Sequence, residues 1–234
     1  GRNFFRHRRT YPAKALKNVN ECPPQLWFAR VSNRTISLEP LMHNDEIAVF
    51  LHREVGITDP HIAEAIASAA TARALSKGEL ILREGQLQND VSLLVDGAVR
   101  TAMLDVAGRD NTDCLITKKG IVIAPCADFT KPSPVHVEAL LPSHIISIPL
   151  ETIGGLLASN LSFALDYIGI LQSAWQMHWD IKTVVCQKAA RDRYLWFLEA
   201  YPGVIDLIPH HYIASYLGMT QVTLSRVRRE VHGG

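Results

Sequence analysis

The sequence predicts an α+β protein in which an antiparallel β-roll is followed by a long helix and a small helical domain. Three observations predict it: short β-rich segments between regularly spaced glycines, a heptad pattern after them, and two short helical segments around a glycine near the end. Hydrophobic residues make up 47% of the 234 residues and charged residues 20%, which is a globular composition and excludes disorder as the main state. We expect a basic N-terminal extension (1–45), the β-roll domain (46–158), the long helix (159–187) and the C-terminal domain (188–234).

The region before the roll combines a basic extension with two predicted helices. Residues 1–20 contain six Arg and Lys residues and no acidic residue. Such a segment either contacts a polyanion or is a solvated tail, and its acid-free, arginine-rich character is also that of a transit peptide. Residues 47–75 are expected to form two helices, because Asp59-Pro60 is an N-cap followed by proline at the first helical position and residues 63–74 are rich in alanine.

The predicted β-roll begins at Leu80. Its short β-rich segments span residues 80–85, 91–97, 99–108, 111–120, 121–125, 135–140 and 144–150. Turn glycines recur at Gly85, Gly97, Gly108 and Gly120, and Asp96-Gly97 is a strong hairpin signal because glycine accepts the positive φ of such turns. No helical segment separates the strands, so an antiparallel roll or barrel is favoured over a parallel sheet.

The segment after the roll carries a heptad seam. Its positions, three and four residues apart in alternation, are Leu161, Ala164, Ile168, Leu171, Trp175, His178, Lys182 and Val185. We expect one long helix that pairs with its copy in a homodimer. The contact should be tightest at Leu161, Ala164, Ile168, Leu171 and Trp175, because the later positions are polar. The alternative is a helix that packs on its own domain.

The last 47 residues have the pattern of a helical unit that ends in a helix-turn-helix. Helices are expected over residues 189–199, 210–217 and 220–231, with Gly218 as a left-handed turn residue and Thr220 as an N-cap. Ala214 is small where the last two helices cross, and Val222 and Val227 are candidates for the inner face of the last helix. The candidates for its outer face are Gln221, Thr223, Ser225, Arg226 and Arg229. Their amide, hydroxyl and guanidinium groups are those that read base edges and grip phosphates, which predicts binding to double-stranded DNA.

This order of elements strongly resembles the Crp/Fnr superfamily of bacterial transcription regulators. The resemblance covers about Ile47–Val231 and is carried by GELILREG, by LLVDGAVR and by the closing run RYLWFLEAYPGVIDLIPHHYIASYLGMTQVTLSRVRRE. It implies a cyclic-nucleotide-binding-like sensor roll, a dimer through the long helix, and a recognition helix over Thr220–Val231 that enters the major groove. RNA polymerase is a candidate partner.

The resemblance also implies roles for single residues of the recognition helix. Gln221, Val222, Ser225 and Arg226 stand at the base-reading positions. Arg226 would be a bidentate donor to guanine. Val222 departs from the pattern, since a glutamate is common there. Valine cannot accept from cytosine but can touch a thymine methyl, so the half-site would differ from that of the best-known members.

The effector of the sensor roll is unknown. Cyclic-nucleotide members have a Gly-Glu pair and an Arg-Ser pair where this chain has Ala124-Pro125 and Ser133-Pro134. We therefore expect no cyclic-nucleotide binding, because the charge that a cyclic phosphate needs is missing and only Lys131 could substitute.

Enzymes and cofactor proteins are the function classes that the sequence disfavours. The four cysteines (Cys22, Cys114, Cys126 and Cys186) form no CxxC and no cluster pattern, so we expect neither a metal nor an iron–sulfur or other cofactor. Cys114 and Cys126 are interpreted as ordinary roll residues, with a thiol switch as the alternative. No nucleophile–base or phosphate-loop motif occurs, so we do not expect an enzyme. No segment is long and apolar enough for a membrane helix or a signal peptide, which favours the cytoplasm.

The leading hypothesis is thus a homodimeric, DNA-binding transcription regulator. A second hypothesis is a ligand or redox sensor whose helical C-terminus contacts a protein partner rather than DNA. Loss of duplex binding with retained dimerisation would favour the second hypothesis.

Overall fold

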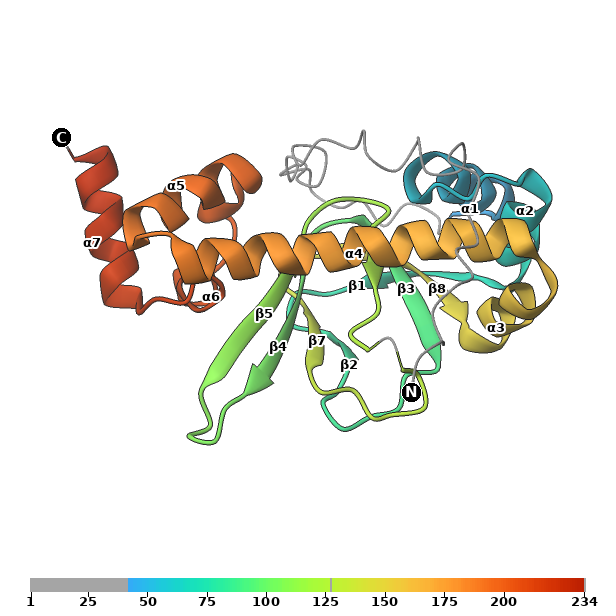
Figure 1. Ribbon diagram of the computed structural model, residues 1–234, viewed down its shortest axis with the longest axis horizontal. Coiled ribbons are helices and arrows are strands. Elements are labelled where there is room, and N and C mark those ends of the chain that lie inside the picture. The colour runs from blue at the N-terminus through green and yellow to red at the C-terminus, as the bar shows by residue number, and fades with distance from the viewer. Residues whose placement is uncertain (1–41, 127, 234) are drawn as a thin grey trace, which may run out of the picture.

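A computed structural model describes residues 42–126 and 128–233 of the chain. Two four-stranded antiparallel sheets form a roll, helices cover one end of it, a long helix runs along its side, and a helical unit follows (Figure 1). The predicted α+β class with roll, long helix and helix-turn-helix is confirmed. The basic extension, apart from residues 42–45, and Cys22 lie outside the described residues.

The helices before the roll end at Ala69, earlier than the predicted residue 75. They are α1 (Asn44–Phe50), the π-helical turn η2 (Leu51–Val55) and α2 (Pro60–Ala69). Asp59 caps α2 as expected, since its carboxylate accepts a hydrogen bond from the backbone NH of His61 at 2.9 Å. The helical prediction for residues 71–75 is wrong, because they form strand β1 (Thr71–Leu75), which pairs with the last strand of the roll. Pairing with a partner far along the chain outweighs the helix propensity of the alanines there.

The roll consists of two sheets with the strand orders β1–β8–β3–β6 and β2–β7–β4–β5. After β1, the strands are β2 (Leu80–Leu82), β3 (Asp90–Asp96), β4 (Val99–Leu104), β5 (Asp110–Ile116), β6 (Val122–Ile123), β7 (His136–Ala139) and β8 (Ser143–Pro149). The four predicted turn glycines all have positive φ. At Gly97, with φ of 93°, a Cβ would also collide with Ser143, so the β3–β4 turn requires glycine on both counts.

The two central strands of the first sheet, β3 and β8, are buried on both faces. Leu94 and Ile145 point towards the second sheet and meet Val137 there. Val91 and Leu93 belong to the opposite face, which the helices cover. Alternate residues of one strand therefore enter two separate cores.

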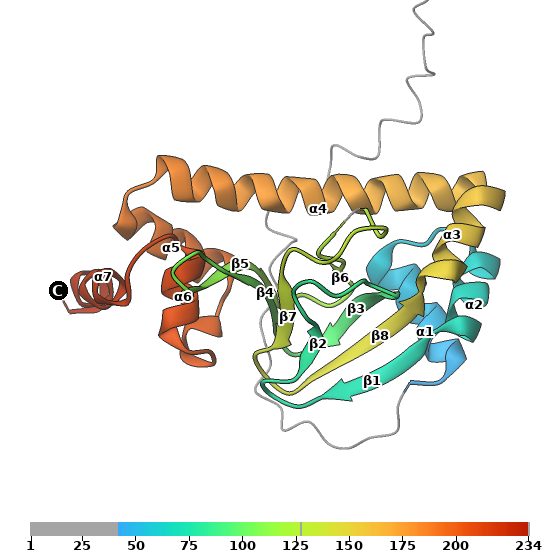
Figure 2. The same ribbon diagram turned by 90° about the horizontal axis from the view of Figure 1, so that it is seen from below.

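The remaining helices lead away from the roll. They are α3 (Leu150–Ser159), α4 (Leu161–Gln187), α5 (Ala190–Ala200), the 3₁₀ turn η3 (Val204–Asp206), α6 (His210–Tyr216) and α7 (Gln221–His232). Asn160 caps α4 by accepting a hydrogen bond from the backbone NH of Phe163 at 3.0 Å. Figure 2 shows α4 along one side of the roll, with α3 at its N-terminal end and α5–α7 beyond its C-terminal end. Within residues 42–126 and 128–233, no helix is long and apolar enough to cross a bilayer.

Candidate nucleic-acid interface

The turn between α6 and α7 is built around Gly218. Its φ is +61°, and a Cβ on it would lie 2.8 Å from Cγ1 of Val185 at the end of α4. Arg193 holds the turn from α5, because its Nη1 donates to the carbonyls of Leu217 and Gly218 at 3.0 Å each. Thr220 then caps α7 by accepting a hydrogen bond from the NH of Thr223 at 3.1 Å. The predicted left-handed turn and N-cap are both present.

The inner face of α7 is formed by Leu224 and Val227. They are 1% and 2% exposed and share one core with Ile213, Ala214 and Leu217. Val227 therefore lies where it was expected, whereas Val222 is 80% exposed, so its inner-face assignment is wrong. Its exposed position agrees with the base-reading position that the resemblance implies. Leu224 was missed, although its spacing of three residues from Val227 is a helical signal.

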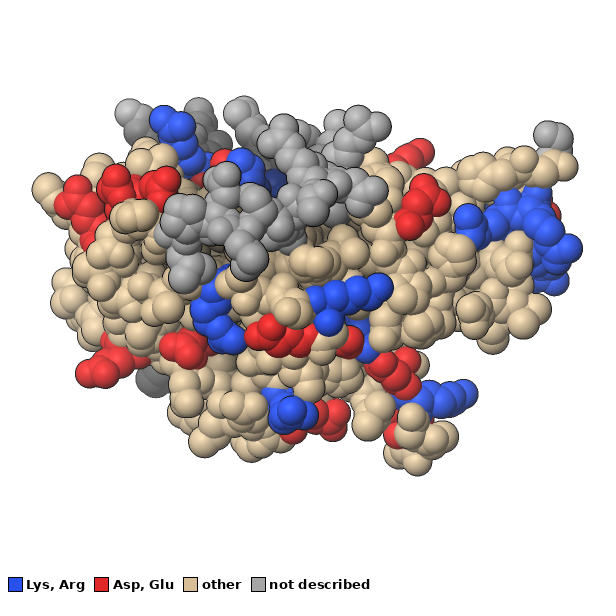
Figure 3. Space-filling model, turned by 180° about the vertical axis from the view of Figure 1, so that it is seen from behind, with Lys and Arg blue, Asp and Glu red and all other residues tan. Residues whose placement is uncertain are grey.

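The outer face of α7 presents exposed Gln221, Val222, Ser225, Arg226 and Arg229. Thr223 is half-buried, and its hydroxyl lies 2.9 Å from that of Thr220, so it belongs to the cap as much as to the outer face. Nε of Arg226 is 3.8 Å from Oε1 of Glu230, and both side chains are more than half exposed. Such a pair is weak in water and leaves the guanidinium available to a ligand. Figure 3 shows basic side chains gathered at the end of the molecule where α7 lies.

A basic residue that sequence reasoning missed connects the two helices. Nη1 of Arg228 lies 2.8 Å from Nε2 of His210, the first residue of α6. One turn further along α7, the hydroxyl of Tyr194 lies 3.0 Å from Nε2 of His232. These contacts fix the angle between α7 and its neighbours, so Arg228 and His210 are positioning residues here.

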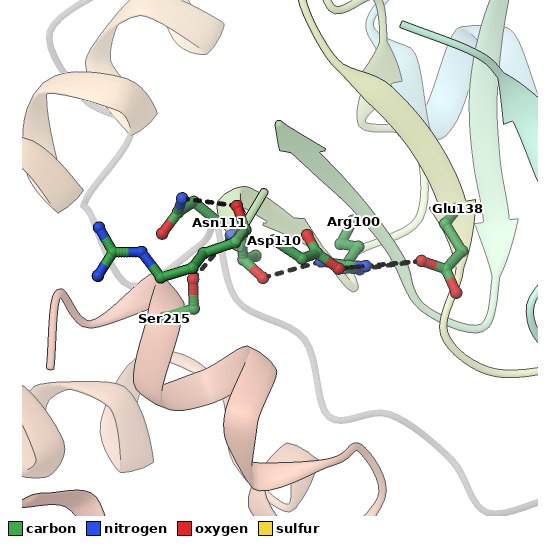
Figure 4. A network of polar contacts seen from close by, with 7 residues as sticks. Arg100, Asp110, Asn111, Glu138 and Ser215 are labelled. Atoms are coloured by element: carbon green, nitrogen blue, oxygen red, sulfur yellow. Dashed lines mark hydrogen bonds and ion pairs between the residues drawn. The ribbon is translucent and has the colours of Figure 1, made fainter. Parts of the chain in front are cut away.

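The helix-turn-helix is attached to the roll through α6 (Figure 4). Arg100 of β4 is 1% exposed and donates hydrogen bonds to Asp110 at 2.5 and 2.8 Å and to Glu138 at 2.8 and 3.1 Å. Its guanidinium carbon lies 3.8 Å from the centroid of the Tyr212 ring of α6, within the range of a cation–π contact. The hydrogen bonds from Arg100 hold the pKa of Asp110 below its usual range.

A backbone hydrogen bond and a tyrosine pair complete this attachment. The backbone NH of Thr112 in β5 donates to Oγ of Ser215 at 2.8 Å. The hydroxyls of Tyr201 and Tyr216 lie 2.7 Å apart, and Tyr201 also donates to the carbonyl of Leu115 at 3.4 Å. The roll and the helical unit therefore meet through a buried, hydrogen-bonded contact and not only through α4.

One exposed side of α4 carries a row of large apolar side chains. Its exposed large side chains are Leu161, Leu165, Ile168, Leu171, Trp175 and Trp179, which we call the α4 stripe. Of the residues predicted for dimerisation, Leu161, Ile168, Leu171 and Trp175 belong to the stripe, whereas Ala164 is half-buried. Leu165 and Trp179 were not predicted. Val185 does not continue the stripe, because it packs against Gly218.

The interior of the roll is nearly filled. The cavity between its sheets has a volume of about 80 Å³, far below the roughly 300 Å³ at which small-molecule sites begin. Ser133 is buried and donates to the carbonyl of Val135 at 2.6 Å, and Nζ of Lys131 lies 3.1 Å from Asp128. The prediction that this region lacks charge overlooked Arg73 of β1, which lines the cavity and lies 3.5 Å from Glu79.

The cysteines and possible metal ligands show no cofactor arrangement in the described part of the chain. No group of three or more His, Cys, Asp or Glu side chains is placed to hold a metal ion there. Cys114 is buried, and burial raises the pKa of its thiol to about 12. Cys126 is half-buried and Cys186 is exposed. Neither pairs with another cysteine among the described residues.

Solved structures of other proteins share the fold of this chain. No family model matches the chain, and no curated protein matches it in sequence. Among solved structures, FixK2 from Bradyrhizobium japonicum is similar with a TM-score of 0.62 and 20% identity over 70% of this chain and 85% of that one. A CooA mutant from Carboxydothermus hydrogenoformans is similar with a TM-score of 0.52 and 19% identity over 70% and 76%. The chain thus shares the fold of Crp/Fnr-type regulators, and the resemblance seen in the sequence is confirmed at the level of the fold.

Proposed function

We propose that this chain is a Crp/Fnr-type transcription regulator that binds double-stranded DNA as a homodimer through α6 and α7. The observation that carries the proposal is the division of α7 into a buried face and an exposed one. Leu224 and Val227 anchor the helix, whereas Gln221, Ser225 and Arg226 project from the opposite side. A helix held in this way can enter the major groove, where amide, hydroxyl and guanidinium groups meet base edges.

The α4 stripe supports the homodimer. Six large apolar side chains on one exposed helix face would bury their surface if the stripe met its own copy, and closed two-fold dimers are the commonest oligomers. The dimer would present two α7 helices to successive turns of the major groove. Sedimentation at micromolar concentration is expected to give about twice the monomer mass of 26.0 kDa. Replacing Ile168 and Leu171 together with lysine should give monomers, and a monomeric unmodified chain would contradict the dimer.

The small cavity inside the roll supports a regulator that works without a cyclic nucleotide. A cavity of about 80 Å³ cannot hold a nucleotide without movement of the sheets. Calorimetry with cyclic AMP and cyclic GMP is expected to show no binding at micromolar concentrations. A micromolar dissociation constant, equivalent to about −8 kcal/mol, would overturn this part of the proposal.

Selection of bound sequences from a random DNA pool tests the proposed activity. We expect a two-fold symmetric sequence whose half-sites lie about one helical turn apart. A second candidate function, contact of α7 with a protein partner, is favoured by one observation, the 80% exposure of the apolar Val222. Recovery of no preferred sequence by a dimeric protein would favour that candidate.

A further inference from the structure

A groove with a basic end lies between α5 and α7, which pack against each other. Its volume is about 700 Å³, which is within the range of sites for small organic molecules. One wall is α7 from Gln221 to His232, a length of about 16 Å at 1.5 Å per residue. The facing wall comes from α5, η3 and the first residue of α6. All lining residues lie within residues 194–233, so neither the roll nor α4 takes part.

The basic end of the groove is formed by the last five residues of α7. His232 follows Arg228 by four residues and Arg229 by three, so the three side chains lie on the same side of the helix and line the groove together. Glu230 contacts Arg226 instead. Neither Arg228 nor Arg229 forms an ion pair with an acidic side chain in the described part of the chain. Two neighbouring positive charges without an acidic partner repel each other, and a bound anion removes that repulsion.

Two side chains of the basic end are held in position by neighbouring helices. Nη1 of Arg228 lies 3.0 and 2.8 Å from the two ring nitrogens of His210, and this is its hydrogen-bonding contact among residues 42–126 and 128–233. Nε and Nη2 of Arg228 therefore remain available as donors. His232 is held by the hydroxyl of buried Tyr194 at 3.0 Å. Donors that are fixed before binding lose little conformational entropy when they meet an oxyanion.

The rest of the lining defines the body of a ligand. Gln221 and Ser225 supply an amide and a hydroxyl about two turns and one turn before the basic end, and Leu198 and Leu224 supply apolar surface. Asp206 of η3 is the one acidic residue among the 12 described residues that line the groove. Its carboxylate can accept hydrogen bonds from hydroxyl groups. This lining suits a molecule with a strongly anionic end and a hydroxyl-bearing body.

We propose that this groove binds a phosphate monoester with a hydroxyl-bearing organic body. Such a phosphate carries nearly two negative charges at pH 7 and three acceptor oxygens, which the guanidinium groups of Arg228 and Arg229 can neutralise and hydrogen-bond. The hydroxyl groups would lie towards Gln221 and Asp206. Gln221, Ser225 and Arg229 also belong to the outer face of α7, so an occupied groove would compete with DNA for them. This competition rests on the proposed function, whereas ligand binding itself does not.

Calorimetry with ribose 5-phosphate tests the site without DNA. We expect one saturable site per chain with a dissociation constant of about 10–100 µM, and at least tenfold weaker binding of ribose and of inorganic phosphate. Arg228→Gln and Arg229→Gln each remove one positive charge from the groove, and each should weaken binding of ribose 5-phosphate at least tenfold. Arg191→Gln removes the same charge from an exposed position of α5 that does not line the groove. This matched control should bind as tightly as the unmodified chain.

Circular dichroism keeps this test independent of misfolding, because only variants that melt as cooperatively as the unmodified chain are compared. Unchanged binding by both groove variants would overturn the proposal, and so would a loss in Arg191→Gln as large as theirs. Absence of saturable binding to the 234-residue chain would also overturn it. If both groove variants then weakened duplex binding, the two arginines would be assigned to backbone phosphates of DNA. Failure of DNA binding would leave the calorimetric result unchanged, so the two proposals can fail separately.

Discussion

Replacement of Arg100 by alanine should destabilise the protein more than any exposed arginine replacement in the same hairpin. The Arg100 side chain is buried, and Asp110 and Glu138 accept four hydrogen bonds of 3.1 Å or less from it. Breaking a buried ion pair by removing one partner costs about 3–5 kcal/mol, because the remaining charge stays buried. The side chains of Asp110 and Glu138 are 36% and 18% exposed, so water can reach both, and we expect about 2–4 kcal/mol.

Urea denaturation followed by circular dichroism measures this loss. At a slope of about 2 kcal/mol per molar, the midpoint should fall by about 1–2 M. The matched control is Arg109→Ala in the β4–β5 turn, where Nε of Arg109 lies 2.7 Å from Asp105 but the arginine side chain is 79% exposed. Exposed pairs contribute little, so the control should leave the midpoint almost unchanged. An Arg100→Ala shift no larger than that of the control would refute the stabilising role of this contact.

The remaining predictions concern acid stability, a thiol and a turn. Because the folded-state pKa of Asp110 is lowered, ionised Asp110 stabilises the fold above about pH 4, and this stabilisation is lost as the pH falls through the folded-state pKa. The free energy of unfolding should therefore depend less steeply on pH in Asp110→Asn than in the unmodified chain. Cys114 should resist an aromatic disulfide reagent in the native protein, whereas exposed Cys186 should react within minutes, and equal rates would contradict the burial of Cys114. Gly218→Ala should destabilise the protein by about 1–3 kcal/mol, because Gly218 has a positive φ and lies close to Val185. Gly155→Ala in the exposed part of α3 should stabilise it by about 0.5–1 kcal/mol. Thermal melting should therefore show shifts of opposite sign for the two variants.

Features that depend on local chemistry could be predicted from the sequence. Gly97 and Gly218 mark turns because their backbone conformation excludes other residues, whatever surrounds them. Asp59 and Thr220 mark helix starts because an N-cap side chain accepts a hydrogen bond from a backbone NH only two or three residues later. The strand rhythm and the helix-turn-helix therefore followed from short segments.

Features that depend on distant partners could not be predicted. The alanine-rich residues 71–75 become a strand only because β8, about seventy residues later, pairs with them. Arg100 resembles a surface residue of a strand until Asp110, Glu138 and Tyr212 surround it. The α4 stripe was predicted only in part, because the side of a long helix that faces solvent depends on which side the roll covers.

Gel-shift titration of Arg226→Ala and Arg229→Ala tests the central claim, that α7 reads DNA, most directly. Each variant is titrated with the selected duplex and with a scrambled duplex at two salt concentrations. Arg226→Ala should lose about 1–3 kcal/mol of discrimination between the two duplexes. Arg229→Ala should weaken binding to both duplexes alike and lower the salt slope by about one. Unchanged affinity and unchanged discrimination in both variants would contradict the assignment of α7 as a recognition helix.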